Sequence, residues 1–271
     1  MTGALAVAAL AVAAVAGARG TWSPCGLSMV SAINPLSERA RGNRYWLTTG
    51  WFVFGSLLGG LVLGAGGALL AFAARPLPTV AALWLGVAAC LVALAADRRL
   101  AGFALPLHPR QVNELWLTQY RRWLYAAGFG MQIGLGFATY IMTAATYLMV
   151  ALAVLAGSPA LAVGTGAVFG LVRGLAVLLS ARCRSAQALR QLHLLLSRLE
   201  PASLRAAVAT EVLVAGGLGY AAAGPAGGVG VLLLASLLLI AGNQRLLVRV
   251  GAPATARRAR TGQPGQYVAA E

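Results

Sequence analysis

The chain has 271 residues, of which 59% are hydrophobic and only 10% are charged, and its formal net charge is +15. Soluble domains carry about 25% charged residues, so this chain has too little polar surface to cover a core in water. Its basic residues are all Arg and fall between apolar runs, a placement that argues against nucleic-acid binding and for membrane topology.

Apolar runs recur along the whole chain. A transmembrane helix needs about 20 apolar residues, because each backbone polar group must be satisfied within the segment. We predict an all-α polytopic bundle of about seven such helices, at residues 4–18, 49–73, 78–96, 124–156, 159–181, 203–222 and 226–242. In this interpretation residues 1–250 form the transmembrane domain and residues 251–271 a disordered, basic cytoplasmic tail. The first run lacks the positively charged start of a cleaved signal peptide, so we expect it to be retained.

The first apolar run is followed by a segment that does not suit a regular transmembrane helix. Residues 19–26 read Arg-Gly-Thr-Trp-Ser-Pro-Cys-Gly. Gly and Pro interrupt the hydrogen-bond ladder of a spanning helix, and the exposed backbone is tolerated where protein or a water-filled cavity surrounds it. Discontinuous helices hold the substrate sites of many transporters. The segment therefore predicts a functional break, with a simple kink and a short surface helix as the alternative.

A faint internal repeat relates two parts of the chain. The stretch 53–55, Val-Phe-Gly with Gly59 following, recurs at 168–170 with Gly174 following, an offset of 115 residues. Near the same offset Gly20 lies opposite Gly136, so the broken first span corresponds to the fourth. Because three spans separate the copies, we predict two inverted three-helix halves, at 1–100 and 108–222, plus an extra helix at 226–248. Close helix packing would also explain these glycines.

Arginines alternate between the predicted loops. Of the 21 arginines, 18 fall in the loops after the first, third and fifth spans and in the C-terminal tail. Basic residues accumulate in short cytoplasmic loops. The N-terminus is therefore predicted outside and the C-terminus in the cytoplasm, with the protein in the cell membrane. Two of the inner loops, around 110–123 and 189–199, have the apolar and basic pattern of helices lying on the membrane surface.

Three charged residues lie within or beside the predicted spans, where charges are costly and are candidates for function. Arg173 and Glu211 are each about eight residues from the predicted cytoplasmic boundary, and at about 1.5 Å per residue they share one depth. We expect them to form an ion pair, either as a structural link or as a gate or proton-coupling pair. Arg19 precedes the break and would meet an anionic substrate, the free carbonyls or Glu211.

The stretch Ser23-Pro24-Cys25-Gly26 inside a first span, the inverted halves and the glycine-bearing second helices resemble the CcdA/DsbD membrane domains of the LysE-type transporter superfamily. The resemblance covers residues 4–222 and implies movement of reducing equivalents by one cysteine in each half, of which Cys25 matches the first. The second position falls near residues 140–141, where this chain has no cysteine, although reversible redox chemistry needs a closable pair. Relatives in this superfamily export small solutes such as sulfite, metal ions or amino acids.

From these features we expect a transporter or exporter of a small solute, with an anion favoured, through a site at the broken first helix. The expected substrate-binding residues are Arg19, Ser23, Cys25, Arg173 and Glu211. The alternatives are a CcdA-like thiol-disulfide carrier using Cys25 and a non-catalytic membrane subunit of a larger complex. We expect no catalytic residues, cofactor or metal. The expected partners are the lipid bilayer and a small molecule, and the sequence leaves open a homo-oligomer or a protein partner in a membrane complex.

Overall fold

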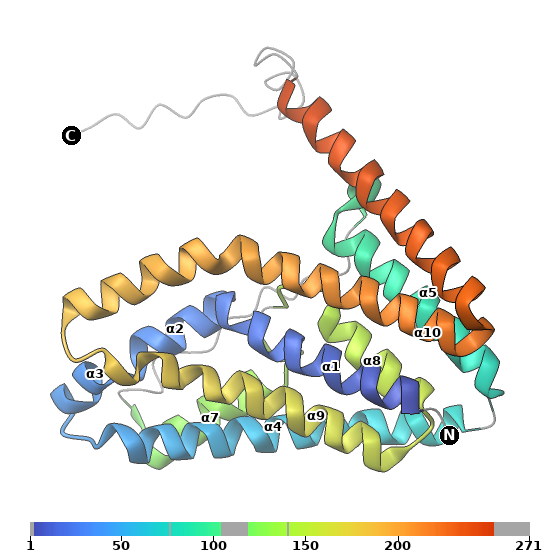
Figure 1. Cartoon of the computed structure of the whole chain (residues 1–271). Helices are drawn as coiled ribbons and strands as arrows, with labels where there is room; N and C mark the ends of the chain where they lie inside the picture. Colours follow the sequence, from blue (N-terminus) through green and yellow to red (C-terminus); the bar gives the residue numbers. More distant parts are fainter. Residues whose placement is uncertain (1–2, 76, 104–118, 140, 252–271) are drawn as a thin grey trace, which may run out of the picture.

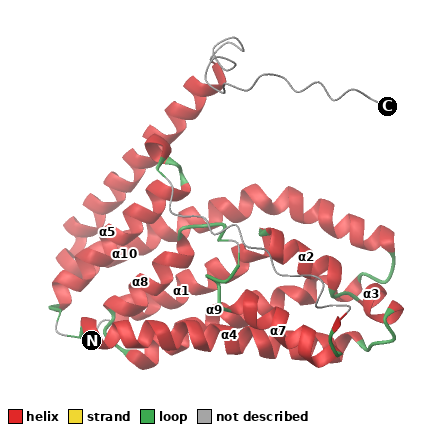
Figure 2. Cartoon of the chain, turned by 180° about the vertical axis from the view of Figure 1, so that it is seen from behind, coloured by secondary structure: helices red, strands yellow, loops and turns green. Residues whose placement is uncertain are grey.

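The computed structural model describes residues 3–75, 77–103, 119–139 and 141–251, with side chains as far as Ile240, and every regular element in these ranges is a helix (Figure 2). The first half contains α1 (Gly3–Arg19), η1 (Gly20–Trp22), α2 (Pro24–Ala32), α3 (Pro35–Ala40), α4 (Tyr45–Ala74), α5 (Thr79–Asp97) and η2 (Leu100–Gly102). The second contains α7 (Arg122–Gly134), α8 (Ala145–Leu155), α9 (Pro159–Leu175), η3 (Ala176–Arg182) and α10 (Ala186–Gly251).

These helices make the chain an integral, multi-pass membrane protein. Within the described residues, five helical segments are long and apolar enough to cross a membrane, and α8 is a shorter apolar helix. The first four of these segments have boundaries close to those of the predicted spans, and the fifth, Ala186–Ile240, begins well before the span predicted at 203–222. The total of seven spans, which counts α7 with α8 as one span and α10 as two, stays a prediction.

The last predicted loop is a sharp turn inside α10. Ala223 (φ −142°, ψ 23°) and Gly224 (φ 66°, ψ −158°) have non-helical backbone. The part of α10 after this turn lies along α5 (Figure 1). The separate surface helix expected at 189–199 is wrong, because this segment is the continuous beginning of α10. Most of the other expected surface helix lies outside the described residues.

Glycines bring α4 and α9 into close contact. A Cβ on Gly60 of α4 would overlap the carbonyl oxygen of Gly166 in α9, and a Cβ on Gly166 would overlap that of Gly60. On another side of α4, Gly55 and Gly59 face the backbone of α7 in the same way. Small residues allow helix backbones to approach closely in membranes, where there is little hydrophobic drive to pair. The packing explanation of these glycines is therefore confirmed.

Helix α1 occupies the space between α9 and α10 and packs against both of them (Figure 1). Its buried face is made almost wholly of Ala and other small or medium apolar residues, with Leu5 and Val12 fully enclosed. The break that follows α1 is thus inside the bundle, with α9 on one side of it and α10 on the other.

Candidate functional site

The predicted break in the first span is present and is built by the Ser-Pro-Cys-Gly stretch. The Ser23 hydroxyl donates to the Gly20 carbonyl (2.7 Å) and accepts from the Gly26 amide (3.0 Å), so it closes η1 and caps α2. Pro24 occupies the first turn of α2, where its missing N–H costs nothing. A Cβ on Gly26 would lie 2.6 Å from the Gly20 carbonyl oxygen, so only glycine fits there without a shift.

A second break interrupts the fourth span, where the internal repeat placed it. Helix α7 ends at Gly134 and α8 begins at Ala145, and the connection passes through Gly136 with a φ of 69°, a left-handed conformation that favours glycine. Asp97 at the end of α5 accepts hydrogen bonds from the Thr143 hydroxyl and from the Ala144 amide (2.6 Å). A carboxylate thereby satisfies one of the free amides at the beginning of α8.

Arg173 of α9 lies where the two breaks meet. It is only 4% exposed, and its Nη2 donates to the Thr139 hydroxyl of the second break (3.1 Å). A Cβ on Gly20 of the first break would lie 2.8 Å from its Nε. Its guanidinium carbon is 5.6 Å from the centre of the Phe169 ring, and within the described residues its Nε makes no hydrogen bond. One enclosed cation therefore contacts both breaks and keeps a donor unused.

Ser23 and Cys25 are the other predicted site residues at the first break. Both are buried, and Cys25 lies within electrostatic range of the Arg173 guanidinium. The structure thus brings together three of the five predicted residues around the first break, and it adds Thr139, which the sequence analysis missed.

The remaining two predicted residues point elsewhere. Arg19 faces α10, and Glu211, which belongs to α10, faces the end of α5. Arg19 donates from Nη1 to the Ser203 hydroxyl of α10 (2.8 Å) and lies within electrostatic range of Asp97. Glu211 is 1% exposed, neither of its carboxylate oxygens accepts a hydrogen bond from the described residues, and Asp97 is again the charge nearby. Asp97 therefore lies within electrostatic range of both Arg19 and Glu211, and the sequence analysis missed it.

The expected ion pair between Arg173 and Glu211 is wrong. Arg173 binds Thr139, Glu211 binds no described group, and Arg19 binds Ser203 rather than Glu211. The physical reason is that equal depth does not fix the direction in which a side chain points around its helix. Helix α1 lies between α9 and α10, so the two charges face different neighbours.

The ion pair that the described residues do form joins Arg41 to Glu38 (2.8 Å) at the end of α3. Glu38 is fully buried and also accepts from the Tyr125 hydroxyl (3.0 Å to each oxygen) and from the Thr48 hydroxyl (2.5 Å). This carboxylate links α3, α4 and α7. The sequence analysis did not single it out, because an acid among loop arginines carries no local signal of burial.

All three cysteines are described and buried, and no disulfide links any of them. Cys25 and Cys90 belong to different apolar clusters. Within the described residues no group of three or more His, Cys, Asp and Glu side chains is placed to hold a metal ion.

Comparison with known proteins identifies relatives over part of the chain. No family model matches it, and no solved structure matches it. The methylamine utilization protein MauF of Paracoccus denitrificans is 34% identical over 184 residues, which cover 64% of each chain. MauF of Paracoccus versutus is 32% identical over 176 residues, 62% of this chain and 63% of the relative. MauF of Methylorubrum extorquens is 28% identical over 153 residues. The chain thus spans less than two thirds of the length of these relatives.

Proposed function

We propose that this protein carries a small anionic solute across the membrane, and that Arg173 binds the anion between the two helix breaks. The observation that carries this proposal is the unused Nε donor of an enclosed guanidinium in contact with both breaks. A buried cation inside a membrane is expensive unless it has a function or a partner. Discontinuous helices that meet near the middle of a bundle are a recurrent arrangement of transport sites.

The residues of the site have separate roles in this proposal. Arg173 supplies the charge, Ser23 and Thr139 fix the two breaks around it, and Cys25 forms the adjoining wall. Because Arg173 is almost fully enclosed, the solute reaches it only when the breaks move. Two inverted halves, each beginning with a broken helix, would allow this by rocking against one another.

Glu211 is the candidate for coupling transport to protons. It is enclosed, lacks a hydrogen-bond partner among the described residues and lies near Asp97. A carboxyl group in such a place takes up a proton at low energetic cost and releases it when the surroundings change. We therefore propose that a proton moves through Glu211 while the anion moves past Arg173.

The names of the relatives support a setting for this activity. They are methylamine utilization proteins, and we propose that this chain has an accessory role in the same process. A membrane subunit that supports a larger assembly is a second candidate, favoured by that shared name. Thiol redox transfer is a third, favoured by the position of Cys25 beside a buried cation and opposed by the lack of a second cysteine at the other break.

The test is uptake of labelled formate, sulfite and methylammonium by proteoliposomes that contain the full chain. We expect an anion to be taken up and methylammonium to be excluded. Arg173→Gln should reduce anion uptake by roughly ten- to a hundredfold, the effect of losing one charge-assisted contact of about 1.5–3 kcal/mol. Arg182→Gln, which removes an exposed arginine at the end of η3, is the matched control.

Two outcomes would contradict the transport proposal. One is uptake of methylammonium in place of the anions, and the other is undiminished anion uptake by Arg173→Gln. Glu211→Gln should lose the response to an imposed pH gradient while Arg182→Gln keeps it. The redox candidate replaces transport if the unmodified protein takes up no anion and Cys25→Ala abolishes thiol-disulfide transfer.

A further inference from the structure

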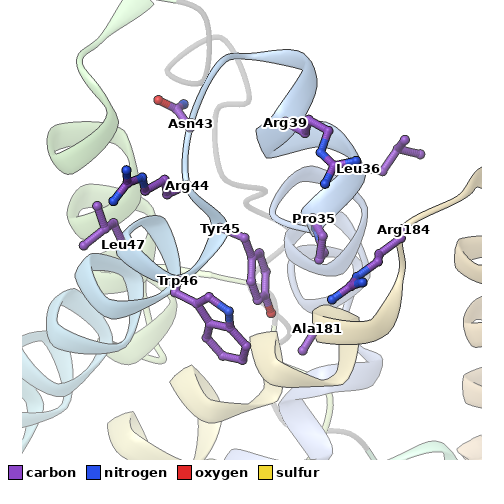
Figure 3. Close-up of a pocket in the computed structure, with 10 residues that line it drawn as sticks. All are labelled: Pro35, Leu36, Arg39, Asn43, Arg44, Tyr45, Trp46, Leu47, Ala181 and Arg184. Atoms are coloured by element: carbon purple, nitrogen blue, oxygen red, sulfur yellow. The ribbon is translucent and has the colours of Figure 1, made fainter.

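A basic cleft opens at the end of the bundle where α3, the beginning of α4 and the end of η3 come together (Figure 3). Its volume is about 630 Å³. It shares no lining residue with the Arg173 site. Its charged and aromatic lining residues are Arg39, Arg44, Arg184, Tyr45 and Trp46. We call it the α3 cleft.

The three arginines of the α3 cleft are not neutralised by any residue that the structure describes. All three are exposed, and none forms an ion pair or a side-chain hydrogen bond with the described residues. The one acid of the α3 helix, Glu38, is turned into the core, where Arg41 and two hydroxyls occupy it. The cleft therefore has a net positive charge and free guanidinium donors.

Two aromatic rings, those of Tyr45 and Trp46, line the cleft beside the arginines. Tyr45 and Trp46 pack edge to face with their centres 5.1 Å apart, and the Tyr45 hydroxyl is held by the Val177 carbonyl (3.0 Å). Trp46 and Leu47 are 66% and 48% exposed and begin the membrane-spanning helix α4. Exposed tryptophan next to arginine at the end of a spanning helix is typical of the lipid headgroup level.

We propose that the α3 cleft binds a phosphate-bearing anion, and that the headgroup of an anionic phospholipid supplies it. Guanidinium groups match phosphate geometry with paired hydrogen bonds, and basic pockets between spanning helices bind anionic headgroups. The open, apolar edge at Trp46 and Leu47 would accept the glycerol and the first part of the acyl chains. Neither the transport site nor its solute enters this inference.

The experiment compares bound lipid and thermal stability for the full chain in detergent micelles. Dioleoyl phosphatidylglycerol should raise the melting temperature and remain bound in native mass spectrometry, whereas dioleoyl phosphatidylcholine should not. Arg39→Gln with Arg184→Gln should weaken binding by about tenfold for each arginine removed. The matched control is Arg182→Gln with Arg190→Gln, which removes the same charge from exposed residues that do not line the cleft.

Soluble glycerol 3-phosphate separates the two sources of phosphate. If glycerol 3-phosphate stabilises the protein as much as phosphatidylglycerol does, and the cleft variant loses this stabilisation, the site is supported with a free phosphate ester as its ligand. Equal loss of binding in the cleft and control variants overturns the proposal, as does unchanged binding in both. Should the double variant not fold, Arg184→Gln alone is compared with Arg182→Gln alone.

Discussion

Arg173 has a single described hydrogen-bond partner, and that partner lies on a different helix break from the one its Nε faces. Thr139→Val keeps the shape of the threonine and removes the acceptor. We expect the free energy of unfolding to fall by about 1.5–3 kcal/mol, the usual cost of losing a hydrogen bond to a buried charge. Thr210→Val, which removes a bond to the Ala206 carbonyl within α10, is the control. Equal melting temperatures for the two variants would show that Arg173 does not depend on Thr139.

Ser23 contributes two hydrogen bonds to the first break, one as donor and one as the cap of α2. Ser23→Ala should lower stability by about 1 kcal/mol, the typical cost of losing a helix cap. Ser236→Ala, which breaks an exposed bond within α10, should have a smaller effect on the melting temperature. A larger effect of the control would mean that the break is held by other groups.

Glu211 has no hydrogen-bond or ion-pair partner among the described residues. Removing its charge should therefore not lower the melting temperature, whereas removing one member of an ion pair would. Glu211→Gln should leave the melting temperature unchanged or raise it, because it removes an acid that is buried near another acid. Asp97→Ala should instead lower it, since two hydrogen bonds to the second break are lost. A marked fall in melting temperature for Glu211→Gln alone would contradict this account and indicate that Glu211 is part of a buried ion pair.

The charged residues show how far the sequence could predict the site. Burial of Arg173 and Glu211 followed from their position in apolar runs, and it is confirmed. Their partners did not follow, because a partner depends on the direction of each side chain and on which helix lies beside it. Thr139 and Asp97 had no signal of their own. Asp97 lies at the end of a predicted span, where polar residues are common, and Thr139 is one of three threonines within the predicted span 124–156.

At the scale of the elements, the crossing of α4 and α9 depends on Gly60 and Gly166. Gly60→Val should cost about 1–3 kcal/mol or more, because its branched side chain would push the α9 backbone away. Gly66→Val is a matched control on the same helix, where a Cβ meets nothing within 4 Å. The comparison is made by thermal unfolding in detergent, with Gly60→Ala as the milder variant if Gly60→Val does not fold. Equal melting temperatures would exclude this crossing.

Helix positions were predictable because long apolar runs, interrupted by Gly, Pro and Arg, mark spans directly. The same local signals placed the first break, whereas the second was placed by the internal repeat, which sets Gly136 opposite Gly20. Local signals failed at 189–199, where a leucine stripe at helical spacing fits a surface helix and the first turns of a longer helix equally well. The local pattern cannot decide between the two, because the decision depends on what packs against Leu189 and Leu196.

For the whole molecule, the arginine distribution predicts which ends of the helices face the cytoplasm. Ala160→Cys and Ala226→Cys, both at exposed positions near turns that are predicted to lie outside, should react with a membrane-impermeant maleimide added outside cells, and Arg184→Cys should not. The native cysteines are a weak background, because all are buried and burial raises the pKa of the Cys183 thiol. Labelling of Arg184→Cys from outside, without labelling of the other two, would reverse the orientation.

The measurement that tests the central claim most directly is a high-resolution cryo-electron microscopy map of the protein in lipid nanodiscs with formate or sulfite added. We predict that the Arg173 guanidinium lies between Gly20 and Thr139, where both helix breaks meet, with density for an anion at its Nε. A map in which Arg173 faces lipid, or in which the two breaks lie on different sides of the bundle, would contradict the proposed site.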